Sequence, residues 1–370
     1  MSTLTSIEKP SVTRGVREHQ EHGLTVLSPV SGQPRRRVLY VNSYGGADFW
    51  QQVKRGWAAP HHLWGCLELV RMGYEVALAE PLPDFYLYRN PLPHDLRLLR
   101  VARSWLGTDG IVYCGHNVLY WLPFLRALGL LRCRIVSLLY AREPLDLGGA
   151  HGGIIALTGA AAEHARQVAP RAKVAHLGWG ADLSVFPQLP YDPQWFLSCG
   201  RTRRDPGLLC AAAARSGRLI RVIGSRVPAR LAWPSNVQFF TEGAAADAVS
   251  YPAFLHDQYA RCAASLIVLQ SDPGEHTAVG LTNLIEAMAM ARPVIVTRTG
   301  ALPTEIDVER MGCGLQVPPD APDALARAIE ELATHRHQAE AMGERGRALC
   351  EARYNITRYA ADLHRFFETL

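Results

Sequence analysis

The sequence lacks the features that define several large classes of protein. None of its eight cysteines forms a Cys-x-x-Cys pair, so we expect reduced thiols in the core and no disulfide framework. No window approaches the roughly 18 uninterrupted apolar residues of a membrane-spanning helix. The first residues are polar and contain no apolar segment, which excludes a signal peptide. We therefore expect a cytoplasmic protein.

Charge is also sparse, and lysine is rare beside arginine. Charged residues make up 20% of the 370 residues, hydrophobic residues make up 48%, and the formal net charge is +5. This composition is typical of folded globular proteins and argues against extensive disorder. A mildly basic balance suits a protein that handles small anionic molecules, and it does not indicate nucleic-acid binding. Abundant arginine and alanine are typical of a high-GC bacterial source.

The hydrophobic pattern alternates between strands and helices. A β-branched run at 38–41 is followed by a helical pattern over 61–72, by Gly73, and by a second strand. This rhythm is typical of βαβ units in a parallel sheet. A second series of the same kind begins at Trp195, and the last 50 residues are mostly helical, over 322–335 and 340–370.

A cluster of prolines near residue 190 divides the two series and indicates a linker. We therefore predict an α/β fold of two doubly wound domains, over 35–187 and 194–353. Residues 1–34 form either a flexible arm or an added edge strand. The final helix, about 354–370, is expected to cross back to the N-terminal domain. Ligands of such sheets bind at the loops that follow the strands.

The residues that follow Gly280 indicate an anion site. Gly280 precedes a predicted helix, whose first backbone N–H groups and dipole favour a diphosphate. Glu286 lies one and a half turns into that helix, where a carboxylate can accept hydrogen bonds from a ribose diol. The alternative is an ordinary helix N-terminus with an incidental glutamate.

The same segment resembles a known family. It contains Gly280-Leu281-Thr282, then Glu286-Ala287-Met288-Ala289, then Arg292-Pro293-Val294-Ile295, in the order found in the donor site of retaining GT-B glycosyltransferases of family 4, the glycosyl transferases of group 1. The resemblance implies two Rossmann-like domains that face a central cleft. It also implies a nucleotide-diphosphate sugar as donor, a hydroxyl acceptor on the N-terminal domain, and transfer with retention. No metal-ligand spacing is present, so we predict no metal and no other cofactor.

One departure from the family pattern concerns the donor sugar. The family has seven residues between two acidic residues, whereas ten separate Glu275 from Glu286 here, and Ala278 occupies the usual place. Either Glu275 reaches the sugar from a longer loop, or His276 or Thr277 takes over the contact.

A second predicted phosphate-binding segment is the Gly-Arg turn after the strand that begins the C-terminal domain. The resemblance assigns the diphosphate to Gly200 and Arg201. The family has a lysine a few residues later, where this chain has Pro206, and we expect Arg204 to substitute for it. Two guanidinium groups can neutralise the departing nucleotide without a metal. The alternative is a solvated basic turn. Gly224 and Ser225 are expected near the nucleotide base.

In the N-terminal domain the resemblance points to two further loops. Gly45 and Gly46 form a turn that lets donor phosphates or the acceptor approach the backbone, and His116 contacts the donor sugar. His61 and His62 begin a helix and line the acceptor cleft in one interpretation. Further candidates for the acceptor are Arg142 and Glu143. For each of these, a tight turn or a structural side chain is the alternative.

Several alternatives remain open. Two stretches that mix Arg with Leu and Trp, 97–107 and 121–134, fit either helices that cover a sheet or a peripheral contact with the inner face of a membrane. The rival functions are a nucleotide-sugar epimerase or phosphorylase on the same fold, and a non-catalytic nucleotide-sugar-binding subunit. A uridine donor is favoured by its frequency in the family. The sequence does not decide the acceptor or the oligomeric state.

Overall fold

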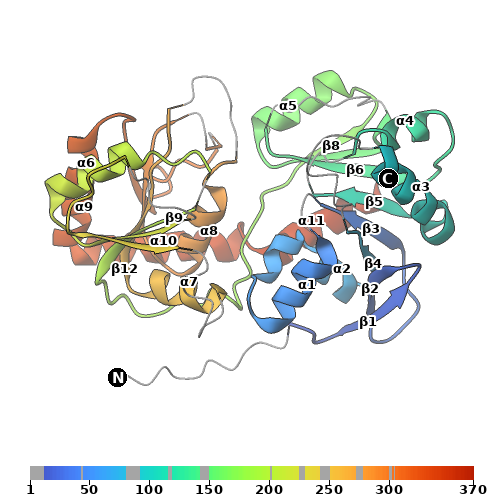
Figure 1. The fold of residues 1–370 in the computed structure, drawn as a ribbon, viewed down its shortest axis with the longest axis horizontal. Helices are drawn as coiled ribbons and strands as arrows, with labels where there is room; N and C mark the ends of the chain where they lie inside the picture. The colour runs from blue at the N-terminus through green and yellow to red at the C-terminus, as the bar shows by residue number, and fades with distance from the viewer. Residues whose placement is uncertain are drawn as a thin grey trace.

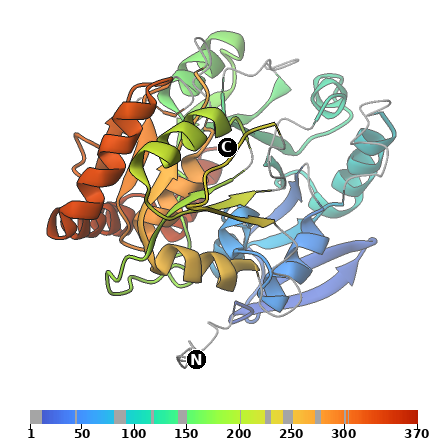
Figure 2. The same cartoon turned by 60° about the vertical axis from the view of Figure 1, so that its left-hand side comes forward.

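Two α/β halves make up the molecule (Figure 1). The computed structural model describes residues 12–42, 45–80, 92–115, 119–141, 150–200, 202–224, 230–241, 251–271, 278–299, 302–303 and 305–370. The N-terminal half is blue to green in Figure 1, and the C-terminal half is yellow to orange. The view in Figure 2 brings the C-terminal half forward, with helices on both faces of its sheet. The prediction of two doubly wound α/β domains is confirmed.

The N-terminal half is built on a mixed sheet. In the described residues its strand order is β1-β2-β4-β3-β5-β6-β7-β8. The strands are β1 (Val16–Glu21), β2 (Leu24–Pro29), β3 (Arg37–Val41), β4 (Glu75–Leu78), β5 (Ile111–Cys114), β6 (Arg134–Leu139), β7 (Gly153–Ala156) and β8 (Lys173–His176). Strands β3 to β8 run parallel, and the hairpin of β1 and β2 adds an antiparallel edge beside β4. Residues 16–29 thus form the added edge, one of the two alternatives for the N-terminal segment.

The C-terminal half has a fully parallel sheet. Its order over the described residues is β11-β10-β9-β12-β13-β14. The strands are β9 (Trp195–Cys199), β10 (Ile220–Gly224), β11 (Val237–Thr241), β12 (Cys262–Ile267), β13 (Val294–Thr297) and β14 (Gly314–Val317). The central strands β9, β12 and β13 are buried along their whole length, which is why they are continuously apolar in the sequence.

Helices cover both sheets. They are α1 (Gly46–Arg55), the 3₁₀ helix η1 (Pro60–Leu63), α2 (Cys66–Arg71), α3 (Leu92–Val101) with a π-helical turn over Ala102–Leu106, α4 (Leu122–Ala127), α5 (Gly159–Val168), α6 (Pro206–Ser216), α7 (Tyr251–Ala260), α8 (Leu281–Ala289), α9 (Pro322–Thr334), α10 (Arg336–Ala352) and α11 (Ile356–Glu368). No helix in the described ranges is long and apolar enough to cross a bilayer.

The prediction of one helix over 61–72 is wrong, because the chain breaks between η1 and α2. Trp64 and Gly65 both have positive φ, at 51° and 81°, so the first segment ends and the second begins in a new direction. Gly65 lies against the Tyr359 ring, where a Cβ would be 3.4 Å from the nearest ring carbon. The break turns His61 and His62 away from the axis of α2.

The helical prediction over 340–370 also needs a correction, because two helices occupy this region. Helix α10 ends at Ala352, and Asn355 caps α11 by accepting a hydrogen bond from the Arg358 N–H at 2.8 Å. The backbone of Asn355 forms a β-bridge with Ala181, beside the linker. Helix α11 then packs on the N-terminal half, where the Tyr359 hydroxyl lies 2.8 Å from that of Tyr113.

Arg292 fastens the linker to the C-terminal half. Its side chain is fully buried, and one guanidinium nitrogen donates to the carbonyls of Leu189 and Pro190 at 3.0 and 2.9 Å. The guanidinium also lies over the Tyr191 ring, 5.3 Å from its centre. The arginine in the Arg-Pro-Val-Ile segment therefore has a structural role.

Candidate functional site

The N-terminus of α8 has the backbone of an anion site. Gly280 has φ of 84°, and a Cβ there would lie 2.8 Å from Ile267 Cγ2, so only glycine fits. No side chain caps the helix. Its first N–H groups, from Leu281 and Thr282 onward, therefore carry the partial positive charge of a helix start without a side-chain carboxylate or hydroxyl on them.

Arg204 lies beside this helix start. Its guanidinium donates to the Cys199 and Thr202 carbonyls at 3.0 Å each, and to Oδ1 of Asn283 in the first turn of α8. None of these partners is a carboxylate, so they leave the guanidinium charge uncompensated. Burial lowers its pKa, but an arginine remains charged at neutral pH.

Gly200 makes room for this arrangement. Its φ is 97°, and a Cβ would lie 2.6 Å from Asn283 Oδ1 and closer still to the Arg204 guanidinium. Asp205 then caps α6 by accepting from the Leu208 N–H at 2.9 Å, which fixes the turn that carries Arg204. The structure thus brings three predicted elements together: Gly200, Arg204 and the start of α8.

Glu286 lies on the same helix and faces the other half of the molecule. It is 3% exposed, and Tyr259 donates its hydroxyl to Oε2 at 3.2 Å. Burial raises the pKa of Glu286 to about 7, and the neighbouring His62 and Tyr259 act in the opposite direction. A buried carboxyl that titrates near neutral pH is a feature of functional sites.

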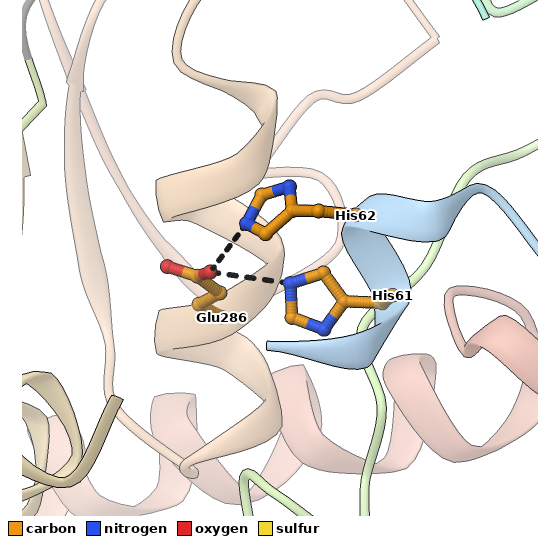
Figure 3. A group of neighbouring side chains, drawn as sticks. All are labelled: His61, His62 and Glu286. Atoms are coloured by element: carbon orange, nitrogen blue, oxygen red, sulfur yellow. Dashed lines mark ion pairs between the residues drawn. The ribbon is translucent and has the colours of Figure 1, made fainter. Parts of the chain in front are cut away.

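The partners of Glu286 across the interface are two histidines of η1 (Figure 3). Nε2 of His61 lies 3.4 Å from Oε1 of Glu286, and Nε2 of His62 lies 4.0 Å from the same oxygen. His61 is fully buried, whereas the side chain of His62 is 34% exposed. The η1–α2 break therefore places both histidines against α8.

A cavity of about 460 Å³ lies between the halves near this cluster. Its lining comes from the ends of β7 and β8, from α8, from the loop after β13 and from the crossing to α11. Leu281 and Ile285 of α8 line it opposite Trp179, and Glu305 lies at its edge. Glu305 accepts a hydrogen bond from the Gly159 N–H at the start of α5, so it links the two halves.

The predicted N-terminal glycines begin α1. The Glu80 carboxylate accepts hydrogen bonds from the Ala47 and Asp48 N–H groups there, the latter at 3.2 Å. Gly45 and Gly46 remain a prediction as a donor contact, and any anion approaching them would share this helix end with a carboxylate. Gly224 ends β10.

Several predicted site residues lie outside the described residues. These are His116, Arg201, Ser225, Glu275 and His276, together with Thr277, Arg142 and Glu143. Their assignments therefore stay predictions.

Sequence reasoning missed two contributors to the site. Asn283 holds Arg204, and Tyr259 of α7 holds Glu286. Asn283 carried a signal, since a polar side chain in the first turn of an anion-binding helix faces the ligand side. Tyr259 carried none, because its position depends on how α7 packs against β12.

The comparisons with known proteins agree on the fold. Among solved structures, sucrose-phosphate synthase from Thermosynechococcus elongatus is 16% identical, with a TM-score of 0.64 over 90% of this chain and 99% of that one. HepE of Anabaena, solved in complex with UDP, is 14% identical, with a TM-score of 0.61 over 90% and 100%. A UDP-forming α,α-trehalose-phosphate synthase from Burkholderia vietnamiensis is 12% identical, with a TM-score of 0.63 over 92% and 99%. No match was found among curated proteins.

The fold is thus GT-B, the two-domain architecture of many glycosyltransferases. Residues 230–335 match the family model described as glycosyl transferases group 1. The resemblance to group 1 glycosyltransferases is therefore confirmed, and that match spans α8 and the Arg-Pro-Val-Ile segment.

Proposed function

We propose that this protein transfers a sugar from a nucleotide-diphosphate sugar to a hydroxyl acceptor with retention of the anomeric configuration. The observation that carries the proposal is the meeting of Arg204 with the uncapped start of α8 through Asn283. A guanidinium with no carboxylate partner among the described residues suits a diphosphate, and so does a helix start without a side-chain cap. Glu286, farther along the same helix, is the proposed contact of the ribose.

The proposed transfer reaction requires charge neutralisation at the leaving group. As the glycosidic bond to the nucleotide breaks, negative charge grows on the diphosphate, and Arg204 with the α8 amides would stabilise it. Arg201 would add a second cation. The proposal includes a front-face reaction in which the leaving phosphate assists deprotonation of the acceptor, and it requires no metal. Closure of the two halves would bring donor and acceptor together.

A uridine nucleotide is the proposed donor. HepE, which shares the fold, was solved with UDP and also with UDP-glucose, and the trehalose-phosphate synthase of similar fold is UDP-forming. The acceptor is proposed to be a small molecule, lipid or glycan hydroxyl. An epimerase remains the enzymatic rival, because it would use the same nucleotide site without an acceptor.

The first experiment is nucleotide binding by calorimetry, with UDP-, GDP- and ADP-sugars and no added metal. We expect UDP-sugar binding, and we expect Arg204→Gln to raise its Kd at least tenfold, about the effect of losing one charge-assisted hydrogen bond. Arg218→Gln is the matched control, since Arg218 pairs with Glu330 on the surface of the same domain. A folded wild type that binds none of these donors would refute the proposal.

Product analysis separates the rivals. A transferase hydrolyses or transfers the sugar with release of the nucleoside diphosphate, whereas an epimerase changes the sugar and keeps it on the nucleotide. A non-catalytic subunit does neither while still binding the donor.

We also propose that the N-terminal half contacts an anionic membrane through α4 and the turn that follows it. Trp121, Phe124, Leu128 and Leu130 are exposed at 42%, 38%, 58% and 46%, and the first two rings pack edge to face with their centres 6.1 Å apart. Exposed arginines follow at 132 and 134. Aromatic and leucine side chains beside cations suit the interface of an anionic bilayer.

A further inference from the structure

The contact of His61 with Glu286 joins the two halves at the predicted ribose site. His61 belongs to η1 in the N-terminal half, and Glu286 belongs to α8 in the C-terminal half (Figure 3). Both side chains are almost completely buried, and their nearest atoms are 3.4 Å apart. A contact of two buried polar groups is costly unless it is satisfied, so its hydrogen-bond chemistry matters.

The backbone decides which nitrogen of His61 carries the proton. The Asp182 N–H donates to Nδ1 at 3.1 Å, so Nδ1 is an acceptor with no hydrogen. Burial lowers the pKa of His61 to about 4, which keeps the ring neutral at pH 7. The remaining proton must then be on Nε2. In the described residues Nε2 makes no hydrogen bond of normal geometry, and Oε1 of Glu286 faces it at 3.4 Å.

The same tautomer argues against a metal ion. His61, His62 and Glu286 place their ligand atoms within 4.8 Å of one another, a spacing that could surround a cation. A histidine that binds a metal through Nε2 needs a lone pair there and usually donates its Nδ1–H to an acceptor. Here Nδ1 faces a donor, which is the reverse arrangement. A hydrogen bond from His61 to Glu286 therefore fits better than coordination.

Aromatic neighbours hold the ring in place. The Trp179 ring packs edge-on at 5.2 Å between centres, and the Phe186 ring lies at 5.6 Å. Tyr259 holds the second carboxylate oxygen from the opposite side. One group from each half therefore faces each oxygen of the carboxylate, and a carboxylate oxygen can accept more than one hydrogen bond.

We propose that His61 is a positioning residue for the donor, orienting Glu286 from the acceptor-side domain so that the carboxylate receives the ribose diol. This inference rests on the proposed function. It gives the N-terminal half a role in donor binding, and it makes affinity for the nucleotide depend on the approach of the two halves. His62 is more exposed than His61 and lies farther from Oε1.

Two substitutions separate this role from a packing role. In His61→Asn, the amide oxygen can still accept from the Asp182 N–H, but the side chain is too short to reach Glu286. In His61→Gln, the amide nitrogen can occupy the place of Nε2 and donate to Glu286. The readouts are the Kd for UDP by calorimetry and the melting temperature of the full chain.

We expect His61→Asn to raise the Kd for UDP about tenfold, the effect of one hydrogen bond to a charged group, and His61→Gln to stay within about threefold of wild type. Unchanged affinity in His61→Asn, or equal losses in both variants that follow their melting temperatures, would overturn the positioning role and leave the proposed function standing. A wild type that binds no UDP overturns both.

Two further measurements start from the wild-type protein. A nitrogen–proton correlation spectrum of the wild-type histidines should show His61 as the Nε2–H tautomer, and an Nδ1–H tautomer would overturn the inference. Melting curves with Zn²⁺ and with a chelator should coincide. If Zn²⁺ raised the melting temperature of wild type but not that of His61→Asn, the contact would be a metal site and the hydrogen-bond inference would be overturned.

Discussion

At the scale of single residues, the ionisation of Glu286 makes nucleotide binding depend on pH. Its raised pKa means that the unliganded protein holds a proton on this carboxyl below about pH 7. Ribose hydroxyls bind the ionised form, so the proton must leave before they bind. His61 and His62 both have lowered pKa values because of burial, and Tyr259 has a raised one for the same reason, so none of them titrates near neutrality.

We therefore predict that UDP binding tightens as pH rises from 6 to about 7 and then levels off. The Kd for UDP falls by up to tenfold per pH unit where binding displaces one proton. Calorimetry from pH 6 to 8.5 measures it. Glu286→Gln provides the control, since it keeps the titration of the nucleotide phosphate and loses that of the carboxyl. If the Kd of wild type and that of Glu286→Gln changed in parallel with pH, the assignment of Glu286 to the ribose would be contradicted.

Individual residues also mark the limit of what the sequence could predict about the site. Glu286, Gly280 and Arg204 were found because the spacing within one helix or one turn carries the signal. The contact of Glu286 with His61 was not found, since it joins positions 225 residues apart and depends on the left-handed break at Trp64 and Gly65. Tryptophan rarely takes that conformation, so no local pattern predicts it.

At the scale of elements, the two Arg- and Trp-containing stretches behave differently. In the first, Leu98, Val101 and Trp105 are buried against the N-terminal sheet, which fits the structural alternative. In the second, Phe124 of α4 is exposed, and so are Leu128 and Leu130 after it, whereas Leu122 and Leu131 are buried. Asp95 of α3 holds the start of α4 by accepting from the Tyr120 and Leu122 N–H groups at 3.0 and 2.8 Å. The membrane proposal thus concerns α4 alone.

We predict that the protein binds vesicles with 30% anionic lipid and not neutral vesicles. The double substitution Trp121→Ala and Phe124→Ala should reduce this binding about tenfold or more, because it removes both interfacial rings. Co-sedimentation at two salt concentrations provides the measurement. A matched control is Trp57→Ala, which removes an exposed tryptophan from the end of α1. Equal loss in the control, or binding to neutral vesicles, would refute the docking surface.

The elements themselves were predicted well where burial sets the pattern. The central strands of both sheets, such as β5 and β13, follow continuous apolar runs. Helix breaks were predicted poorly. The turn at Asn355 interrupts a helical pattern because its backbone pairs with Ala181, and that pairing exists only once the linker is in place. An asparagine that can cap a helix was the one local signal available.

At the scale of the whole molecule, α11 ties the end of the chain to its beginning. Tyr359, Leu363 and Phe367 are fully buried by this contact, and the Tyr74 hydroxyl lies 2.8 Å from Nδ1 of His364. The Arg36 guanidinium donates to the Phe367 carbonyl at 2.7 Å. The N-terminal core therefore includes side chains from the last fifteen residues.

We predict that a chain ending at residue 353 loses the cooperative folding of its N-terminal half. Each large buried side chain of α11 contributes about 1.5–3 kcal/mol, and their sum is comparable with the whole stability of a domain. Calorimetric melting and hydrogen exchange of strands β3 to β6 provide the measurement. Tyr359→Phe is the control, since it removes one hydroxyl and keeps the packing. An unchanged melting transition of the truncated chain would contradict this role of α11.

The position of α11 has a consequence for synthesis on the ribosome. The N-terminal half emerges first, but its core stays open until α11 has left the exit tunnel, so it cannot finish folding before the C-terminal half has been made. The apolar surface that α11 later covers is exposed throughout translation of the second half. Chaperone contact during translation is therefore expected on the face formed by α2, Tyr74 and Tyr113.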